Sequence, residues 1–206
     1  MKVFVINVPE RIDRLDAITK ELNQLGLEFE VWVATKEDNG VIGLLNTMIG
    51  LLKHCIENGI ESALFLEDDA TFLQGKDVIE KCISQLPEDF DLFYLGAKFG
   101  EAITELYSEN LFNIKHSYTT HAIYYSAIGM KKLLFEIEDM LNSNRLVRPL
   151  DVLIMAKIQK QGNCYCSFPL IASQRSSFSD IEKREVNYEP FIVQRYYEHT
   201  KHLKWQ

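Results

Sequence analysis

Apolar residues along this 206-residue chain follow two alternating spacings. Short uninterrupted apolar runs are typical of buried strands, and apolar residues three or four positions apart are typical of helices that cover a sheet. In the first half, strands and helices are expected to alternate in the order 3–8, 11–25, 29–33, 42–56, 63–66, 78–86 and 91–96. Such alternation predicts an α/β fold, with a mostly parallel central sheet and helices on both faces.

The second half has a looser pattern. Its expected elements are β-rich residues at 111–125, helices at 127–141 and 150–160, and a strand at 164–168. Chain length favours one domain over residues 1–206, because a chain of this size buries one sizeable core. We expect a ligand-binding half at 1–100, a second half at 101–180 and a tail at 181–206.

The tail mixes aromatic and basic residues. Phe191, Tyr196, Tyr197 and Trp205 alternate with Arg195, Lys201 and Lys204. One interpretation is an interfacial helix that touches a membrane peripherally. The other is a helix that packs back on the domain. No apolar stretch approaches the roughly 18 residues of a membrane span, and the first apolar run is too short for a signal peptide, so a cytoplasmic protein is expected.

Composition narrows the ligand classes. The net charge of −8 and the pI near 5.2 argue against a nucleic-acid partner, because nucleic-acid surfaces need clustered Lys and Arg. An anionic ligand would therefore need a metal ion or a local basic pocket. The four cysteines fit no zinc-binding spacing and are expected to be reduced thiols in the core, at positions 55, 82, 164 and 166.

Three consecutive acids, Glu67, Asp68 and Asp69, end the apolar run at 63–66. The carboxyl ends of strands are where α/β folds bind their ligands. Along an extended continuation, Glu67 and Asp69 point to one side and Asp68 to the other. At least two carboxylates can then converge on a hard cation such as Mg²⁺ or Mn²⁺, which leaves coordination positions for phosphate oxygens. The alternative is a solvated turn after a buried strand.

The chain resembles glycosyltransferase family 25, which includes bacterial lipooligosaccharide galactosyltransferases and is similar to the collagen galactosyltransferases. Seven short segments occur in the order seen in that family: VFVINVPERIDR, GVIGLLNT, LFLEDDATF, DLFYLG, AIYYSAIGMKKLL, PLDVLI and the late element of Gln174 with Ser179, Asp180 and Ile181. The resemblance spans nearly the whole chain. It implies a GT-A type nucleotide-sugar-binding fold and inverting transfer of galactose or a related hexose.

The donor implied by the resemblance is a nucleotide diphosphate sugar, most often a UDP-sugar, and the acceptor is a glycan or a lipid-linked glycan, as in lipopolysaccharide biosynthesis. A divalent ion would neutralise the departing diphosphate as a Lewis acid. Asp69 is the first choice of ligand, completed by Glu67 or Asp68. Arg11 and Arg14 follow the first strand and can pair with a diphosphate, although a solvated helical turn also explains them.

Further binding residues are expected around this centre. Asn7, at the end of the first strand, offers a donor and an acceptor to a nucleoside, and a turn-forming role explains it almost as well. Gln174 and Asp180 would close over the donor and acceptor if the late element matches the family. His121 is a candidate acceptor or metal contact, or a structural histidine.

One segment departs from the family pattern. Family members commonly have Gly-Cys-x-x-Ser-His where this chain has Gly43 to Met48, so Thr47 and Met48 replace the serine and the histidine. The thioether of Met48 is a poor hydrogen-bonding group, whereas Thr47 retains a hydroxyl. We therefore expect Thr47 near the donor and a changed preference for the donor sugar.

An inverting transfer needs a base, and a carboxylate is the usual one. Asp151 is the candidate, because it lies in the PLD segment that resembles the family and follows Pro149 at the start of a helix. A stabilising acid in a first helical turn is the alternative. At the level of function, the alternatives are a silent sugar-nucleotide or glycan-binding module and a metal-dependent phosphohydrolase.

Overall fold

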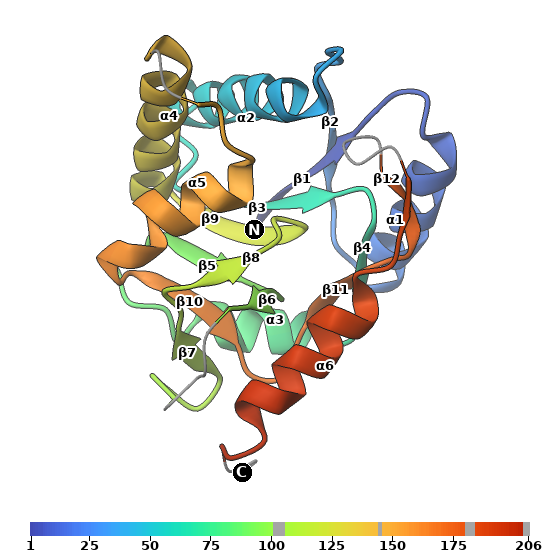
Figure 1. Ribbon diagram of the computed structural model, residues 1–206. Helices are drawn as coiled ribbons and strands as arrows, with labels where there is room; N and C mark the ends of the chain where they lie inside the picture. Colours follow the sequence, from blue (N-terminus) through green and yellow to red (C-terminus); the bar gives the residue numbers. More distant parts are fainter. Residues whose placement is uncertain (101–105, 144–145, 180–183, 204–206) are drawn as a thin grey trace.

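The computed structural model describes residues 1–100, 106–143, 146–179 and 184–203. Its centre is a seven-stranded sheet (Figure 1). The strands lie in the order β2 (Glu30–Val33), β1 (Lys2–Asn7), β3 (Ser62–Glu67), β9 (Ala122–Ser126), β5 (Leu92–Tyr94), β10 (Cys164–Ser167) and β7 (Leu111–Asn113). Five of the seven run in one direction, because β9 and β7 are antiparallel to their neighbours. The prediction of an α/β fold with a mostly parallel sheet is confirmed.

Strand β9 is the main departure from the expected alternation of parallel strands. It lies between β3 and β5 and is antiparallel to both, with Ile123 opposite Phe65 and Tyr94. Every one of its residues is buried. A fully apolar run predicts a central strand but carries no information on direction, because both faces are covered whichever way the strand runs.

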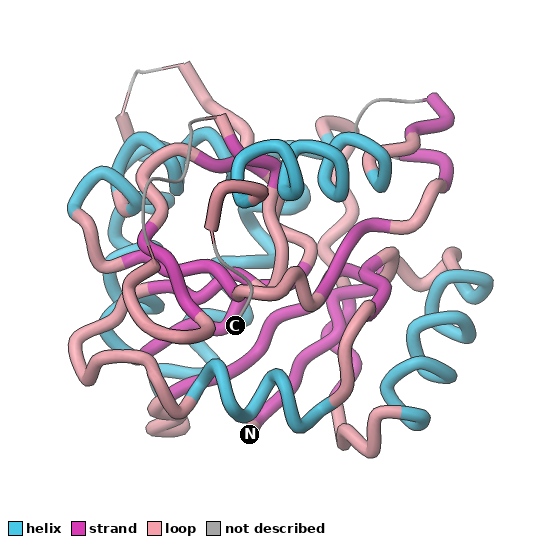
Figure 2. Tube along the Cα trace, turned by 90° about the horizontal axis from the view of Figure 1, so that it is seen from below, coloured by secondary structure: helices cyan, strands magenta, loops and turns pink. Residues whose placement is uncertain are grey.

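Helices cover both faces of the sheet (Figures 1 and 2). One face carries α2 (Gly40–Glu57), α4 (Ala127–Asn142), α5 (Leu150–Lys157) and α6 (Glu189–Thr200), whereas α1 (Ile12–Gln24) and α3 (Lys76–Ile83) cover the other. Alternation along the strands produces the two cores. In β1, Phe4 faces the first group of helices, and Val3 and Val5 face the second.

The ends of the helices follow from local sequence. Asn39 caps α2 by accepting a hydrogen bond from the Val41 N–H group at 2.9 Å. Gly26 and Gly59 follow α1 and α2 with φ angles of +64° and +65°, a conformation that glycine adopts without steric cost. The predicted boundaries near these positions therefore agree closely with the structure.

Three two-stranded ribbons extend from the main sheet. They pair β4 (Ala70–Phe72) with β11 (Ala172–Gln174), β6 (Lys98–Phe99) with β8 (Ser117–Tyr118), and β12 (Ser177–Ser179) with β13 (Arg184–Val186). The β4–β11 ribbon begins directly after the acid run. It brings the segment around residue 174 back to the end of β3.

Helix α6 packs on the domain. It buries Ile192, Tyr196 and Thr200, and it contacts β6 and β11. This is the second of the two interpretations of the tail. Within the described residues, no helix is both long enough and apolar enough to cross a membrane. The four cysteines are free and buried, as expected.

Candidate functional site

The acid run lies where two parallel strands end side by side. Strands β1 and β3 are paired in register, with Ile6 opposite Glu67, so Asn7 and the acids emerge at the same edge of the sheet. Helix α1 starts five residues after β1 ends and carries Arg14 back over this edge. The sequence order strand, short loop and helix therefore positions a guanidinium beside the carboxylates.

Asp68 has two partners from that first unit. Its Oδ2 accepts a hydrogen bond from Asn7 Nδ2 at 2.9 Å, and its Oδ1 lies 2.8 Å from an Arg14 guanidinium nitrogen. Asn7 Nδ2 also donates to the Arg11 carbonyl oxygen at 3.2 Å. The side chain of Asp68 is buried, so Asn7 and Arg14 fix its orientation.

Asp69 is held from both halves of the chain. Arg14 lies 3.3 Å from Asp69 Oδ2, and Gln174 Nε2 donates to both carboxylate oxygens at 3.2 Å. The Arg175 N–H group donates to the Asp69 carbonyl oxygen at 2.7 Å. Burial raises the pKa of Asp69 to about 6, against the lowering effect of Arg14.

Glu67 is held by the turn that leads into β9. Thr120 Oγ1 donates to Glu67 Oε1 at 2.6 Å, and the Glu67 N–H group donates to the His121 carbonyl oxygen at 2.9 Å. Burial, followed by the negative charge of Asp69, raises the pKa of Glu67 to about 8. Thr119 adopts a φ of +74°, an unusual conformation for a threonine, immediately before these contacts.

The predicted alternation of the three acids is only partly realised. The chain turns at Asp68 and Asp69 instead of continuing extended, so both aspartates reach the same guanidinium of Arg14. The extended geometry was wrong at these two residues because β4 starts at once with Ala70 and requires the chain to change direction. The negative charge of Asp69 nevertheless contributes to the raised pKa of Glu67.

Asp151 belongs to a different element from the acid run. It lies in the first turn of α5, and its Oδ1 accepts a hydrogen bond from the Val152 N–H group at 2.8 Å. Its negative charge contributes to the raised pKa of Glu67. The described contacts of Asp151 are therefore those of an acid in a first helical turn, and its part in the site remains a prediction.

His121 lies behind the acid run and has no solvent exposure. Burial lowers its pKa to about 4, outweighing the opposite effect of the Ala172 backbone, so the imidazole is neutral near pH 7. This burial separates His121 from an acceptor in solution. Asp180 lies outside the described residues.

Two other predicted residues lie away from the carboxylates. Arg11 pairs with Asp13 at 2.9 Å, an interaction that lowers the pKa of Asp13 to about 2. Thr47 is buried in α2, where its hydroxyl donates to the Gly43 carbonyl oxygen at 2.7 Å and accepts from the Thr35 N–H group at 2.8 Å. Met48 packs in the core. Thr47 thus fastens the loop after β2 to α2.

Sequence reasoning missed Thr120 and Arg175. Thr120 precedes β9, and an antiparallel strand brings its amino end to the carboxyl end of β3. The signal was a polar Thr-Thr-His triplet before a buried run, which becomes informative only when the strand direction is known. Arg175 pairs with Glu21 of α1, which also accepts hydrogen bonds from Thr71 and from the Phe72 N–H group.

The carboxylates suit a hard cation shared with a ligand. Among the described residues no three His, Cys, Asp or Glu side chains form a complete metal-binding group. Carboxylate oxygens are nevertheless the donors that Mg²⁺ and Mn²⁺ prefer, and one or two of them suffice when phosphate oxygens and water complete the coordination. Burial is the main cause of the raised pKa values of Glu67 and Asp69, so a bound cation would favour their charged forms.

Comparisons with known proteins add a structural likeness only. The sequence matches no known protein family and no curated protein. The fold is similar to that of protein A197 from STIV, with 14% identity, a TM-score of 0.49 and coverage of 90% of this chain and 92% of that chain. It is also similar to a glycosyltransferase involved in glycosylation of the major capsid of PBCV-1, with 8% identity, a TM-score of 0.49 and coverage of 74% and 73%.

A third similar structure is a mutant of the Drosophila β1,4-galactosyltransferase 7 in complex with manganese, UDP-Gal and xylobiose. It has 9% identity and a TM-score of 0.49, over 90% of this chain and 74% of that chain. Such identities and TM-scores assign neither a family nor an activity to this chain.

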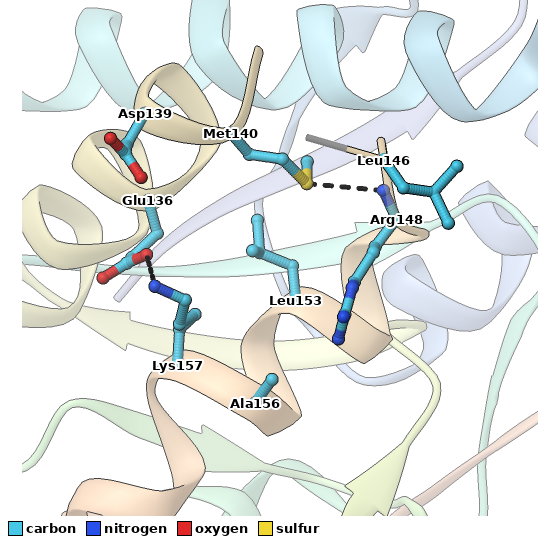
Figure 3. Close-up of a pocket in the computed structure, with 8 residues that line it drawn as sticks. All are labelled: Glu136, Asp139, Met140, Leu146, Arg148, Leu153, Ala156 and Lys157. Atoms are coloured by element: carbon cyan, nitrogen blue, oxygen red, sulfur yellow. Dashed lines mark hydrogen bonds and ion pairs between the residues drawn. The ribbon is translucent and has the colours of Figure 1, made fainter. Parts of the chain in front are cut away.

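A separate pocket of about 400 Å³ lies between α4 and α5 (Figure 3). Leu153, Ala156 and Lys157 of α5 line it, and Lys157 pairs with Glu136 of α4 at 2.9 Å. With 100° per residue, these positions lie on the side of α5 opposite Asp151. The pocket is therefore distinct from the carboxylate site.

Proposed function

We propose that this protein is a metal-dependent inverting glycosyltransferase, similar to family 25, that moves a galactose-like hexose from a nucleotide diphosphate sugar to a glycan acceptor. The observation that carries the proposal is the cluster of Glu67, Asp68 and Asp69 at the carboxyl end of β3, where Arg14 contacts both buried aspartates. In the described part of the chain, the cation in contact with the aspartates is Arg14.

This charge balance favours a bound cation over a bare anionic ligand. A diphosphate placed beside the carboxylates would add negative charge to a site that is already acidic and buried. The repulsion between these charges is strong in a low dielectric. Asp69 would hold Mn²⁺ or Mg²⁺, with Asp68 or Glu67 completing the site. When bound, the ion would supply Lewis-acid stabilisation of the departing diphosphate.

The other polar residues around the acid run would position the aspartates and the donor. Asn7 and Gln174 orient Asp68 and Asp69 through the hydrogen bonds described above, and their amide groups border the expected donor site. Arg14 would keep the aspartates in position and also face the diphosphate. Arg11 and Thr47 would contribute indirectly, through the loops that they fasten.

Asp151 would act as the base. Its Oδ1 is oriented by the Val152 N–H group, which leaves Oδ2 for the acceptor hydroxyl. As that hydroxyl attacks the anomeric carbon, its proton passes to the carboxylate and the bond from the sugar to the diphosphate breaks. Attack from the face opposite the leaving group inverts the anomeric centre.

The test is a panel of nucleotide sugars assayed with Mn²⁺ or with EDTA. We expect one UDP-hexose to raise the melting temperature in Mn²⁺, because a ligand that binds only the folded state stabilises it. The same donor should release UDP when a glycan acceptor is supplied. Equal binding of every nucleotide with and without the metal would contradict the metal-linked proposal.

A silent sugar-nucleotide-binding module is the second candidate. It is favoured by the pairing of Arg14 with both aspartates, because that guanidinium already neutralises part of the charge that a metal would meet. Such a module would bind the UDP-hexose without releasing UDP. Measurement of UDP release in the same panel separates the two candidates.

A further inference from the structure

An aromatic and basic surface patch adjoins the carboxylate site. It consists of Lys98, His116, Tyr118 and Phe191, from β6, the segment before β8, β8 and α6. Phe191 is 55% exposed, and the other three side chains are partly exposed. On this acidic chain, Lys98 and His116 lie beside one exposed and one partly exposed ring, which distinguishes the patch from an ordinary solvated surface.

Contacts within the patch fix the two rings. Tyr118 is hydrogen-bonded through its hydroxyl to His116 Nε2 at 2.9 Å, and the two rings lie edge to face at 5.3 Å. Lys98 is paired with Tyr118 across the β6–β8 ribbon, and its Nζ lies 5.8 Å from the centre of the Phe191 ring. Rings held in this way lose little freedom when a ligand binds.

The patch continues into the carboxylate site through the backbone. Tyr118 is two residues before Thr120, whose hydroxyl binds Glu67. Strand β8 packs against α5, the helix that carries Asp151, and β6 packs against α6. In Figure 1 the β6–β8 ribbon accordingly lies between α5 and α6. The patch thus lies against the helix that carries the proposed base.

We propose that this patch binds the glycan acceptor, with Tyr118 as the stacking platform for a pyranose ring. The proposal rests on the proposed function, which requires an acceptor on the Asp151 side. The C–H face of a hexose packs on an aromatic ring, and His116 and Lys98 offer donors to the surrounding hydroxyl groups. A nucleobase also stacks on aromatic rings, so the experiment below measures UDP binding beside saccharide binding.

The experiment measures saccharide binding by saturation-transfer NMR with lactose, cellobiose, maltose and chitobiose, at saturating UDP and Mn²⁺. At least one disaccharide should bind the wild-type protein. Tyr118→Ala and Phe191→Ala should each weaken that binding about tenfold, as expected for loss of a central aromatic contact. Tyr118→Phe keeps the ring and should bind within about twofold of wild type, since one exposed hydrogen bond contributes little.

Phe135→Ala is the matched control, because Phe135 is an aromatic residue of α4 that is 66% exposed and lies outside the patch. It should leave saccharide binding unchanged. UDP binding in Mn²⁺, measured by calorimetry, should be equal in all five proteins, wild type included.

The outcomes separate the two proposals. Absence of binding by all four disaccharides, or equal weakening by Phe135→Ala, overturns the acceptor assignment. Weaker UDP binding in Tyr118→Ala with unchanged saccharide binding also overturns it and moves the nucleobase to the patch. Failure of wild-type UDP binding overturns the proposed function, whereas selective loss of disaccharide in Tyr118→Ala would still support a saccharide site.

Discussion

Buried carboxylates lie at two opposite edges of the same sheet, a single aspartate at one edge and two aspartates beside a partly buried glutamate at the other. Asp91 precedes β5 at the amino edge, and Glu67, Asp68 and Asp69 lie at the carboxyl edge of β3, which runs in the same direction. Asp91 is completely buried and pairs with Lys132 of α4 at 2.8 Å. The aspartates at the other edge share one arginine between them.

The two edges differ in the number of cations that contact their carboxylates. At Asp91 one lysine balances one acid, which is the ordinary arrangement for a buried charge. At the carboxyl edge the acids outnumber the cation in contact with them, and the pKa values of Glu67 and Asp69 are raised. This imbalance between acids and the contacting cation, among the described residues, is the basis for the proposed cation site.

The strongest test of this contrast is Asp69→Asn. It should lower transfer by more than about 100-fold, because loss of even an outer contact to a metal ligand costs roughly 10- to 100-fold. Circular dichroism should show an intact fold. The matched control is Asp91→Asn, for which transfer per folded molecule should match wild type, and equal loss of transfer in the two variants would remove the distinction between the edges.

Asp151→Asn tests whether the acid in α5 acts as the base in the transfer. The amide keeps the shape but cannot accept a proton, so transfer should fall by roughly 10²-fold or more while UDP binding in calorimetry stays unchanged. If transfer in this variant equals that of wild type, Asp151 has only a helix-stabilising role and the base lies elsewhere.

Lys132→Met tests the ion pair of Asp91 at the amino edge of the sheet. It leaves Asp91 buried without its cation, so the free energy of unfolding in urea should fall by about 2–3 kcal/mol. Adding Asp91→Asn should recover part of this loss, because no buried charge then remains. A larger loss in the double variant than in Lys132→Met alone would argue against an ion-pair role.

The last test concerns the pH dependence of stability, measured in EDTA. The pKa of Glu67 is raised from 4.5 to about 8, so the folded protein holds a proton that the unfolded chain releases. This contribution to stability is fully present below about pH 4.5 and is lost as the pH rises through about 8. Glu67→Gln should flatten this decline in urea titrations, and an unchanged pH profile would contradict the assigned shift.

The fold and the acid site could largely be predicted from spacing. The run at 63–66, the helix ended by Gly26 and the acids after β3 all depend on local pattern, and each lies where expected. The spacing of apolar residues indicates which residues are buried, but not which element packs against them. It therefore predicted that residues near 122–126 form a strand but gave neither its direction nor its position between β3 and β5.

Contacts between distant segments were the part that could not be predicted. The pairing of Gln174 with Asp69 depends on the β4–β11 ribbon, and the bond from Thr120 to Glu67 depends on the direction of β9. The resemblance suggested Gln174 but not its partner. Thr47 illustrates the converse, because a hydroxyl expected near the donor is engaged in fastening its own helix to a loop.

The insertion of β9 has a consequence for synthesis of the chain on the ribosome. Strand β3 is complete at residue 67, yet its second neighbour comes from residues 122–126. Until those residues emerge, one edge of β3 and the carboxylates at its end have no neighbouring strand, and exposed strand edges invite pairing with other chains. A fragment that ends near residue 100 would carry this edge permanently, so the two halves of the chain share a single folding event.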